Sequence, residues 1–466
     1  MIRAFLALPL PEPVLSALRV QQFLLPLPRK EPPENFHLTL VFLGEQPEPD
    51  LRAAHEGFEM LRLPRFRDFE PWHQLRRESR AFLQAHIAHT LAFYERNACD
   101  PDGGFFHYLL DDGSVYEREH RHLVSATRYV FNWSQAYRHG GAARHRAWAA
   151  HALAHLQQAL CLPAGHPNAG LYAWTVRAGA VEDDRALAYG QAFVLLALSQ
   201  ACRIGLATPQ QVAAAFDRME QAFYLPAQRA YADERGSDGC LSDYRGQNAN
   251  MHQCEACLAA FEATGEARYL ERAESLIERF AFELADPATS LICEHYDLDW
   301  QPDWEYQKGR RDDIFKPWGY QTGHQTEWAK LILQAHALRP QRRWLDRAAE
   351  LQLAAWRHGW DAQHGGLIYG FAPDGSPWDS DKYFWVQAES LAAAARLATV
   401  TGEQRYWAAY DHLWAYAWRH FVDHEHGAWW RILTADNRKY SDEKSPAGKV
   451  DYHTLGAAHD VLDVLK

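Results

Sequence analysis

The sequence predicts a mainly α-helical protein, an (α/α)6 barrel, with a small incomplete α/β segment at its N-terminus. Residues 1–67 alternate strand-like and helix-like patterns, whereas residues 68–466 consist of long helical stretches rich in Ala, Leu, Glu and Arg. In this second part a helix end, a turn-forming cluster and a short apolar run recur together at near-equal intervals. We therefore expect two domains, with the boundary between residues 67 and 68.

The N-terminal segment is expected to contain strand, helix, strand and helix, at residues 3–8, 13–25, 37–43 and 51–63. The second strand carries the motif His37-Leu38-Thr39. With this HxT motif the segment resembles the N-terminal half of the RNA 2′,3′-cyclic phosphodiesterase family, in which two histidines flank one phosphate as acid and base. The segment has no second HxT, so we expect a truncated remnant or a docking segment rather than a phosphodiesterase.

The long domain contains six repeats, and each repeat is marked by one residue of its apolar run. The markers are Phe105, Leu171, Tyr231, Leu291, Leu367 and Trp429, at intervals of 66, 60, 60, 76 and 62 residues. Each interval can hold two helices and a short hairpin, so six helical pairs can close into the barrel. The longest interval includes the aromatic stretch 297–322, which we expect to be a loop that covers the mouth of the barrel.

The inner helices of such a barrel converge on one mouth, so residues at equivalent distances past the markers should face a common cavity. Positions 17 to 24 residues past five markers, and 33 past the fourth, carry Arg128, Tyr189, Asn248, His252, His324, Trp385 and His453. Glu327 shares a helix face with His324, and Glu389 shares one with Trp385.

These side chains suit proton transfer on a sugar. Imidazoles titrate near neutral pH, and a carboxylate beside an imidazole raises its basicity, which is the role we expect of Glu327 beside His324. Aromatic rings can bind the C–H face of a sugar, while Arg, Asn and Glu bind its hydroxyls.

Five ordered stretches carry a resemblance that covers the chain from about residue 70 onward. They are Tyr244–His252, Glu294–Asp297, Gly323–Trp328, Trp385–Glu389 and Asp451–His453. In these stretches the chain resembles the N-acylglucosamine 2-epimerase superfamily, and within it the aldose–ketose isomerase branch, which includes D-mannose isomerases.

The resemblance implies interconversion of unphosphorylated sugars without a metal or another cofactor. It implies that His324 and His453 are the catalytic acid–base groups and that His252 assists binding or ring opening. It further implies that the remaining residues bind hydroxyls or orient the histidines: Arg128, Tyr189, Asn248, Glu327, Trp385 and Glu389. Gln191 and Gln325 depart from the pattern, and we expect them to retune the substrate.

We therefore expect metal-independent isomerisation of an aldose to its ketose, D-mannose to D-fructose, through a cis-enediol. His453 would remove the C2 proton, while His324 protonates and deprotonates the sugar oxygens. The alternative is a sugar 2-epimerase that acts on N-acylglucosamine, N-acylmannosamine or a mannose-type sugar, because return of the proton to C2 from the opposite face needs the same residue types.

Three rival functions use the same residues less well. A metal enzyme could draw on His252-x-x-Glu255, but no HExxH occurs, and carboxylate-bridged bundles use the reverse Glu-x-x-His order. A glycoside hydrolase could pair Glu255 with Glu327 or Glu389, yet three histidines at matched positions favour proton transfer. A non-catalytic sugar-binding module would need no histidines at those positions.

Composition limits the partners. The chain has 466 residues and a formal net charge of −12, which argues against a nucleic-acid partner. Its apolar stretches fall short of the roughly 20 residues that span a bilayer, and seven scattered cysteines suit a reducing compartment. We expect a cytoplasmic protein that binds a monosaccharide, without a membrane partner, and a homodimer is one possible assembly. The Cys254-x-x-Cys257 pair is expected on a buried helix face.

Overall fold

The computed structural model describes residues 2–9, 37–46, 80–310, 313 and 316–465. Contacts divide the chain into two compact units, Met1–Gln74 and Leu75–Lys466. The predicted boundary at residues 67 and 68, and the helices predicted at 13–25 and 51–63, lie outside the described residues.

In the first unit, two antiparallel strands confirm the strand predictions. β1 (Ile2–Pro9) pairs with β2 (His37–Gln46), and Pro9 lies opposite His37. The resemblance of this segment to phosphodiesterases stays a prediction.

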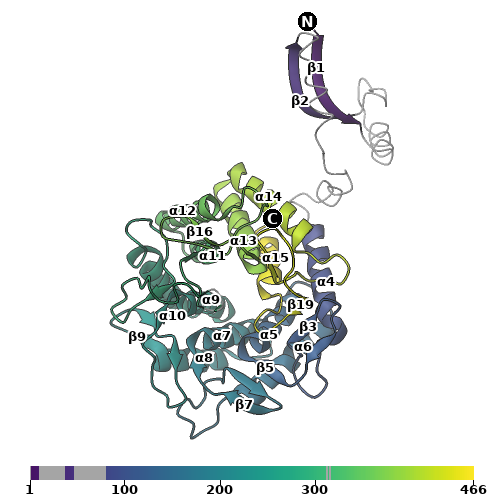
Figure 1. Cartoon of the computed structure of the whole chain (residues 1–466). Coiled ribbons are helices and arrows are strands. Elements are labelled where there is room, and N and C mark those ends of the chain that lie inside the picture. Colours follow the sequence, from purple (N-terminus) through teal and green to yellow (C-terminus); the bar gives the residue numbers. More distant parts are fainter. Residues whose placement is uncertain (1, 10–36, 47–79, 311–312, 314–315, 466) are drawn as a thin grey trace. The chain divides into compact units, whose positions relative to one another are not determined.

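The second unit is built from two concentric rings of helices, which Figure 1 shows along the barrel axis. The outer helices are α4 (Arg80–Asn97), α6 (Ala143–His155), α8 (Pro209–Phe223), α10 (Ala267–Ile277), α12 (Arg342–Gly359) and α14 (Gln404–His420). The inner helices are α5 (Leu123–Arg138), α7 (Ala188–Arg203), α9 (Gln247–Thr264), α11 (Thr322–Leu338), α13 (Phe384–Thr401) and α15 (Tyr452–Val464). Two π-helical turns, η3 (Leu156–Leu160) and η4 (Glu278–Glu283), extend α6 and α10. Outer and inner helices alternate along the chain, which confirms the predicted (α/α)6 barrel.

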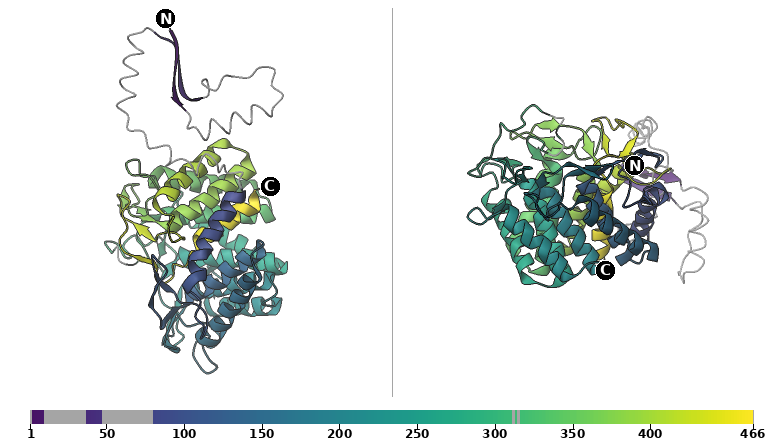
Figure 2. Two further views of the ribbon diagram at one scale, coloured as in Figure 1. Left: turned by 90° about the vertical axis from the view of Figure 1, so that its right-hand side faces the viewer. Right: turned by 90° about the horizontal axis from the view of Figure 1, so that it is seen from below.

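The inner ring is closed. Each inner helix packs on the next, and α15 packs on both α5 and α4, as Figure 2 shows for the yellow and dark blue helices. The Arg80 guanidinium of α4 donates to the Leu462 carbonyl of α15 at 2.7 Å. The last helix therefore lies against the first.

The inner and outer helices differ in which of their residues are buried. In α13 the run 392–395 is four alanines, all fully buried, because the centre of the ring leaves little room for side chains. The outer helix α10 buries one stripe of residues three or four positions apart, which include Leu270, Ala273 and Ile277. An all-round apolar helix belongs inside and an amphipathic one outside, so the sequence pattern places each helix in its ring.

The six predicted markers lie at β-pairs that follow the outer helices. The paired residues are Cys99–Phe105, Cys161–Tyr172, Tyr224–Tyr231, Ala285–Ile292, Trp360–Leu367 and Val422–Trp429. Four markers are themselves paired, and the other two, Leu171 and Leu291, come directly before a paired residue. The predicted six-fold repeat is therefore confirmed.

In four repeats, an amide side chain fixes this pair to the inner helix. The fourth residue of α7, α9, α11 and α13 is Gln191, Asn250, Gln325 and Gln387. Gln191 accepts a hydrogen bond from the Tyr172 N–H at 3.0 Å and donates to its carbonyl at 2.7 Å. Asn250, Gln325 and Gln387 bond the backbone of their own pairs in the same way. The prediction that Gln191 and Gln325 retune the substrate is therefore wrong, because both amides are buried and bonded to backbone.

Short antiparallel strands connect neighbouring repeats near the start of the inner helices. Five of the six inner helices directly follow such a strand. The described strands of this unit are β3 (Tyr108–Leu110), β4 (Val115–Glu117), β5 (His120–His122), β6 (Thr175–Arg177), β7 (Ala180–Asp183), β8 (Ala186–Leu187), β9 (Tyr224–Leu225), β10 (Ala230–Tyr231), β11 (Glu234–Arg235), β12 (Arg245–Gly246), β13 (His295–Tyr296), β14 (Tyr320–Gln321), β15 (Gly370–Phe371), β16 (Pro377–Asp379), β17 (Lys382–Tyr383), β18 (Ile432–Leu433) and β19 (Glu443–Ser445). Six pairs join successive repeats, namely β5–β6, β8–β11, β12–β13, β14–β15, β17–β18 and β19–β3.

All seven cysteines lie among the described residues, and each is a free thiol. Cys254 and Cys257 are both fully buried on α9, which confirms the predicted buried helix face. None of the helices in the described ranges is long and apolar enough to cross a membrane.

Candidate active site

A cavity of about 690 Å³, measured with its open mouth, lies where the N-terminal turns of the six inner helices meet. Its walls include eight of the nine predicted site residues: Arg128, Tyr189, Asn248, His252, His324, Glu327, Trp385 and His453. The prediction that residues at equivalent offsets face one cavity is confirmed. Glu389 is the exception, since it contacts a histidine instead of lining this cavity.

The barrel explains this convergence. Inner helices alternate with outer ones, so all six run in the same direction and present their N-termini at one end. The eight cavity residues all lie in the first two turns of their helices. A helix N-terminus carries a partial positive charge, so this end of the barrel stabilises negative charge on a bound oxygen.

His453 is held as a neutral base. Its Nδ1 lies 2.7 Å from Glu389 Oε1, so the carboxylate holds the ring proton on Nδ1. Its Nε2 accepts a hydrogen bond from Arg128 Nη2 at 3.2 Å. Burial, followed by the Arg128 guanidinium, holds the pKa of His453 well below its ordinary value of 6.5. The Nε2 lone pair is therefore unprotonated at neutral pH.

His324 has a carboxylate partner that sequence reasoning missed. Its Nδ1 lies 2.9 Å from both oxygens of Glu294, a residue just before β13. Gln247 Nε2 donates to Glu294 Oε2 at 3.1 Å, and Trp328 Nε1 donates to Gln247 Oε1 at 2.7 Å. The prediction that Glu327 fixes His324 is wrong, because Glu327 points toward His252. Glu294 stands in one of the five stretches that carry the family resemblance, which was the available signal.

Trp385 lies beside both histidines. Its ring centroid is 5.0 Å from that of His324 and 5.7 Å from that of His453. A Cβ added to Gly323 would meet the Trp385 ring at 2.2 Å, so only glycine leaves room for the indole there. The two imidazoles thus share one aromatic neighbour on the cavity wall.

His252 lies between two carboxylates. Its Nδ1 is 3.0 Å from Glu255 Oε2 and 4.0 Å from Glu327 Oε1. Burial and the neighbouring Glu389 raise the pKa of Glu327 well above its ordinary value. Tyr189 packs edge-on against His252, with 5.0 Å between ring centroids, and its hydroxyl accepts from Arg128 at 3.2 Å.

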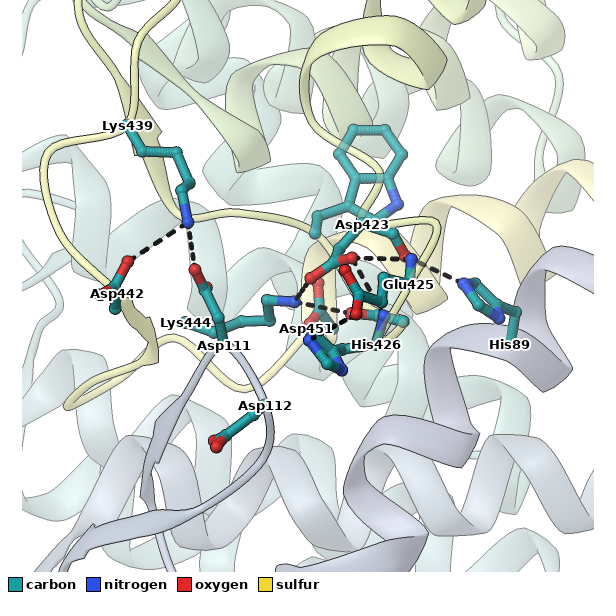
Figure 3. Close-up of polar contacts among 12 residues, drawn as sticks. His89, Asp111, Asp112, Asp423, Glu425, His426, Lys439, Asp442, Lys444 and Asp451 are labelled. Atoms are coloured by element: carbon teal, nitrogen blue, oxygen red, sulfur yellow. Dashed lines mark hydrogen bonds and ion pairs between the residues drawn. The ribbon is translucent and has the colours of Figure 1, made fainter.

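The loop that leads into α15 is held by an exposed and a buried ion pair, which Figure 3 shows. Lys439 pairs with Asp111 near β3, and Lys444 pairs with Asp423. The strand β19 also pairs with β3, so the loop is fixed to the first repeat. These contacts place the loop in the cavity wall and set the start of the helix that carries His453.

The long loop at 297–322 lies beside the cavity. Among its described residues, none lines the main cavity, and Lys316 lines an adjoining one that shares Tyr189 and Asn248. Trp300 is buried against Phe280, with 5.6 Å between ring centroids. The prediction that this loop covers the mouth is therefore not confirmed.

Two groups of side chains place donor atoms within 4.8 Å of one another, close enough to surround a cation. One is His252, Glu255 and Glu327, and the other is Glu327, Glu389 and His453. Both groups include Glu327, and each combines it with a histidine that lines the cavity.

Comparisons with known proteins give a consistent result. The sequence profile of the N-acylglucosamine 2-epimerase (GlcNAc 2-epimerase) family matches residues 104–457. A D-mannose isomerase from Marinomonas mediterranea is 45% identical over 391 residues, which cover 83% of this chain and 98% of that protein. A crystal structure of D-mannose isomerase, also 45% identical, superposes with a TM-score of 0.81 over 83% of this chain and 98% of that one. The cellobiose 2-epimerase of Bacillus thermoamylovorans shares the fold at 18% identity, with a TM-score of 0.73 over 82% of this chain and 98% of that one.

Proposed function

Because the chain belongs to the N-acylglucosamine 2-epimerase family, we propose that it is an aldose–ketose isomerase that converts D-mannose to D-fructose. One observation carries the proposal: His324 and His453 line one cavity, and each has a carboxylate at its Nδ1. Relatives named D-mannose isomerase, one of them 45% identical, support mannose as the substrate.

In the first step, His453 Nε2 takes the proton from C2 of the open-chain aldose. The C2–H electron pair becomes the C1–C2 double bond, and O1 takes a proton from the imidazolium form of His324. The product is a cis-enediol. Glu389 and Glu294 support this step because each carboxylate stabilises the positive charge on its own imidazole.

In the second step, the neutral His324 removes the proton from O2 and a C2 carbonyl forms. The double-bond electrons then take the proton from His453 at C1, which gives the ketose and restores both histidines. The chain's own side chains supply every proton in this scheme, so it needs neither a metal nor another cofactor.

The remaining cavity residues are proposed to hold the sugar. Arg128 and Asn248 offer donors to its hydroxyls, and the Trp385 ring offers an apolar face to its C–H groups. His252 would assist binding or ring opening, as the family resemblance implies.

The second candidate is a sugar 2-epimerase, which the family profile also fits. Epimerisation would require the proton to return to C2 from the opposite face. His324 is the candidate donor of that proton, because it is the second imidazole beside Trp385 in the same cavity. The product distinguishes the two reactions.

Proton and carbon NMR of D-mannose with the protein in deuterated water tests the proposal. Isomerisation gives fructose, with deuterium at C1 wherever His453 exchanges its proton with solvent, and His453→Ala abolishes it. Untouched mannose would contradict the proposal, and glucose as the only product would favour the epimerase. N-acetylmannosamine would then be the next substrate to test.

A cytoplasmic location is part of the proposal and is supported by the seven free thiols. For residues 1–67 we propose a remnant or docking role, because the segment carries one HxT motif where a phosphodiesterase needs two.

A further inference from the structure

Lys330 of α11 lies among three carboxylates that come from three different helices. Its side chain is 7% exposed. Its Nζ is 2.6 Å from Glu389 Oε2, 3.5 Å from Glu255 Oε1 and 3.9 Å from Glu327 Oε1. A lysine is rarely this buried unless it is paired, and here the pairing is threefold.

Each of these carboxylates also reaches an imidazole of the cavity. The second oxygen of Glu389 contacts His453 Nδ1 at 2.7 Å, and the second oxygen of Glu255 contacts His252 Nδ1 at 3.0 Å. The ammonium of Lys330 is therefore one carboxylate away from two of the three site histidines.

We propose that Lys330 is a positioning residue for the isomerisation: its ammonium takes the place of a cation among Glu255, Glu327 and Glu389 and keeps Glu389 ionised behind His453. This inference rests on the proposed function for its kinetic consequences. It assigns to a lysine the charge that a metal ion would otherwise supply.

The geometry of the cluster carries the argument. The two groups of donor atoms that could surround a cation consist of these three carboxylates with His252 and His453. Three carboxylates this close and this buried cannot all ionise without a compensating positive charge. Lys330 supplies that charge from within the chain.

The protonation states agree with this reading. Burial alone would raise the pKa of Glu255, but Lys330, followed by His252, holds it below its usual range. Burial raises the pKa of Glu389, and Lys330 is the main group that opposes the rise. Without Lys330, we therefore expect Glu389 to take up a proton at neutral pH, because burial would then act without the charge that opposes it most.

Other charged and titratable groups face the cluster from the neighbouring helices. Tyr452 of α15 lies beside Glu255, and its pKa is raised well above its ordinary value by burial and by that carboxylate. Arg396 and Asp460 line the same second cavity as Lys330 and form an ion pair, in which Arg396 Nε donates to Asp460 Oδ2 at 2.6 Å. None of these groups replaces the ammonium, because Tyr452 is neutral and Arg396 is already paired.

A second cavity gives access to the cluster from the other end of the barrel. It holds about 660 Å³, measured with its opening, and Lys330, Glu255 and Glu389 all contribute to its walls. A small alkylammonium ion can therefore reach the cluster without passing the substrate. This makes chemical rescue a direct test.

The experiment compares Lys330→Met, Lys330→Arg and Lys330→Ala with Gln334→Leu as the control. Gln334 lies one turn further along α11, lines the second cavity and donates to Asp460 at 2.9 Å, without contact to the three carboxylates. We expect the Met variant to lose at least tenfold in kcat at pH 7, and the acidic limb of its kcat/KM profile to move to higher pH. We expect the Arg variant to keep the acidic limb of the wild-type kcat/KM profile. We expect added ethylammonium to restore activity to the Ala variant.

A second readout needs no substrate. In protein with 15N-labelled histidine, wild-type His453 shows the tautomer with its proton on Nδ1. The Met variant loses that tautomer at neutral pH, because a protonated Glu389 donates to Nδ1. Wild type without isomerase activity would refute the proposed function while this readout still tests the role of Lys330.

The inference is overturned if the Met variant folds and keeps both the wild-type profile and the His453 tautomer. It is equally overturned if activity falls while the acidic limb and the tautomer stay unchanged, since Lys330 would then be merely structural.

Discussion

Replacement of Glu389 by Gln tests the electrostatic support of His453 with almost no change in shape. The carboxylate accepts the Nδ1 proton of His453 at 2.7 Å and takes the Lys330 ammonium on its other oxygen at 2.6 Å. An amide cannot stabilise the imidazolium as an anion does. Its NH2 group can also donate to Nδ1, which would move the ring proton to Nε2 and remove the base from the cavity.

The expected magnitude follows from the lost contact. A hydrogen bond to a charged group contributes about 1.5–3 kcal/mol, and about 1.4 kcal/mol corresponds to tenfold in rate. The charge alone therefore accounts for a loss of roughly 10- to 100-fold. Loss of the reactive tautomer adds to this, toward the ~10⁴-fold upper range of general base catalysis. The loss should fall on kcat rather than KM, because Glu389 does not line the substrate cavity.

The assay is the initial rate of fructose formation from D-mannose over a range of mannose concentrations. Glu274→Gln serves as the matched control, since Glu274 forms a surface ion pair with Arg339 at 2.6 Å. A Glu389→Gln protein with wild-type kcat would refute the assignment of His453 as a base that depends on its carboxylate. An unchanged kcat with a raised KM would instead assign Glu389 to sugar binding.

Three further outcomes are expected. Arg128→Gln should move the acidic limb of kcat/KM to higher pH, because the guanidinium holds the pKa of His453 down. Gln387→Leu should lower the free energy of unfolding by about 2–4 kcal/mol in urea denaturation, because it leaves a buried N–H and C=O of the preceding hairpin unpaired. Unfolding should also become easier as the pH falls from 6.5 toward 3, because burial lowers the pKa of His86 and of His122 to about 3. The unfolded chain then binds protons that the native state does not, at about 1.4 kcal/mol per pH unit for each histidine.

Each outcome has its own check. Arg128→Lys keeps a positive charge, so the acidic limb of its kcat/KM profile should stay closer to that of the wild type. An acidic limb that does not move in Arg128→Gln would contradict the reasoning. Gln352→Leu is the control for Gln387, since the buried amide of Gln352 has no hydrogen-bond partner among the described residues and its loss should be nearly neutral. A urea midpoint that stays flat from pH 6.5 to 4 would contradict the assignment of neutral buried histidines.

The fold was largely predictable because the signals are local. Periodic helices, six spaced turn clusters and the helix restart before His453 can all be read along the chain, and the cavity residues follow from equivalent offsets. The partner of His324 could not be read in this way. Helix spacing identifies only neighbours on the same helix, so Glu327 was assigned to His324, whereas Glu294 reaches it from a loop 30 residues earlier.

The role of the amides was misjudged for a similar reason. A glutamine next to a site residue such as Tyr189 looks like a contact for substrate. The successive positions of a helix point in different directions, however, and Gln191 points to the hairpin behind it. Lys330 carried no signal at all, because a lysine on a helix ordinarily faces solvent.

The sequence by itself determined the helical repeat, the (α/α)6 closure and the set of side chains at the N-terminal ends of the inner helices, because hydrophobic periodicity and turn chemistry act over short distances. Only the tertiary structure decided which carboxylate meets which imidazole. Glu389 and His453 are 64 residues apart, and the ammonium of Lys330 lies among carboxylates from three helices. Closure of the helix ring brings these groups together. Burial lowers the effective dielectric constant around them, so the attraction between their charges is strong enough to fix their positions.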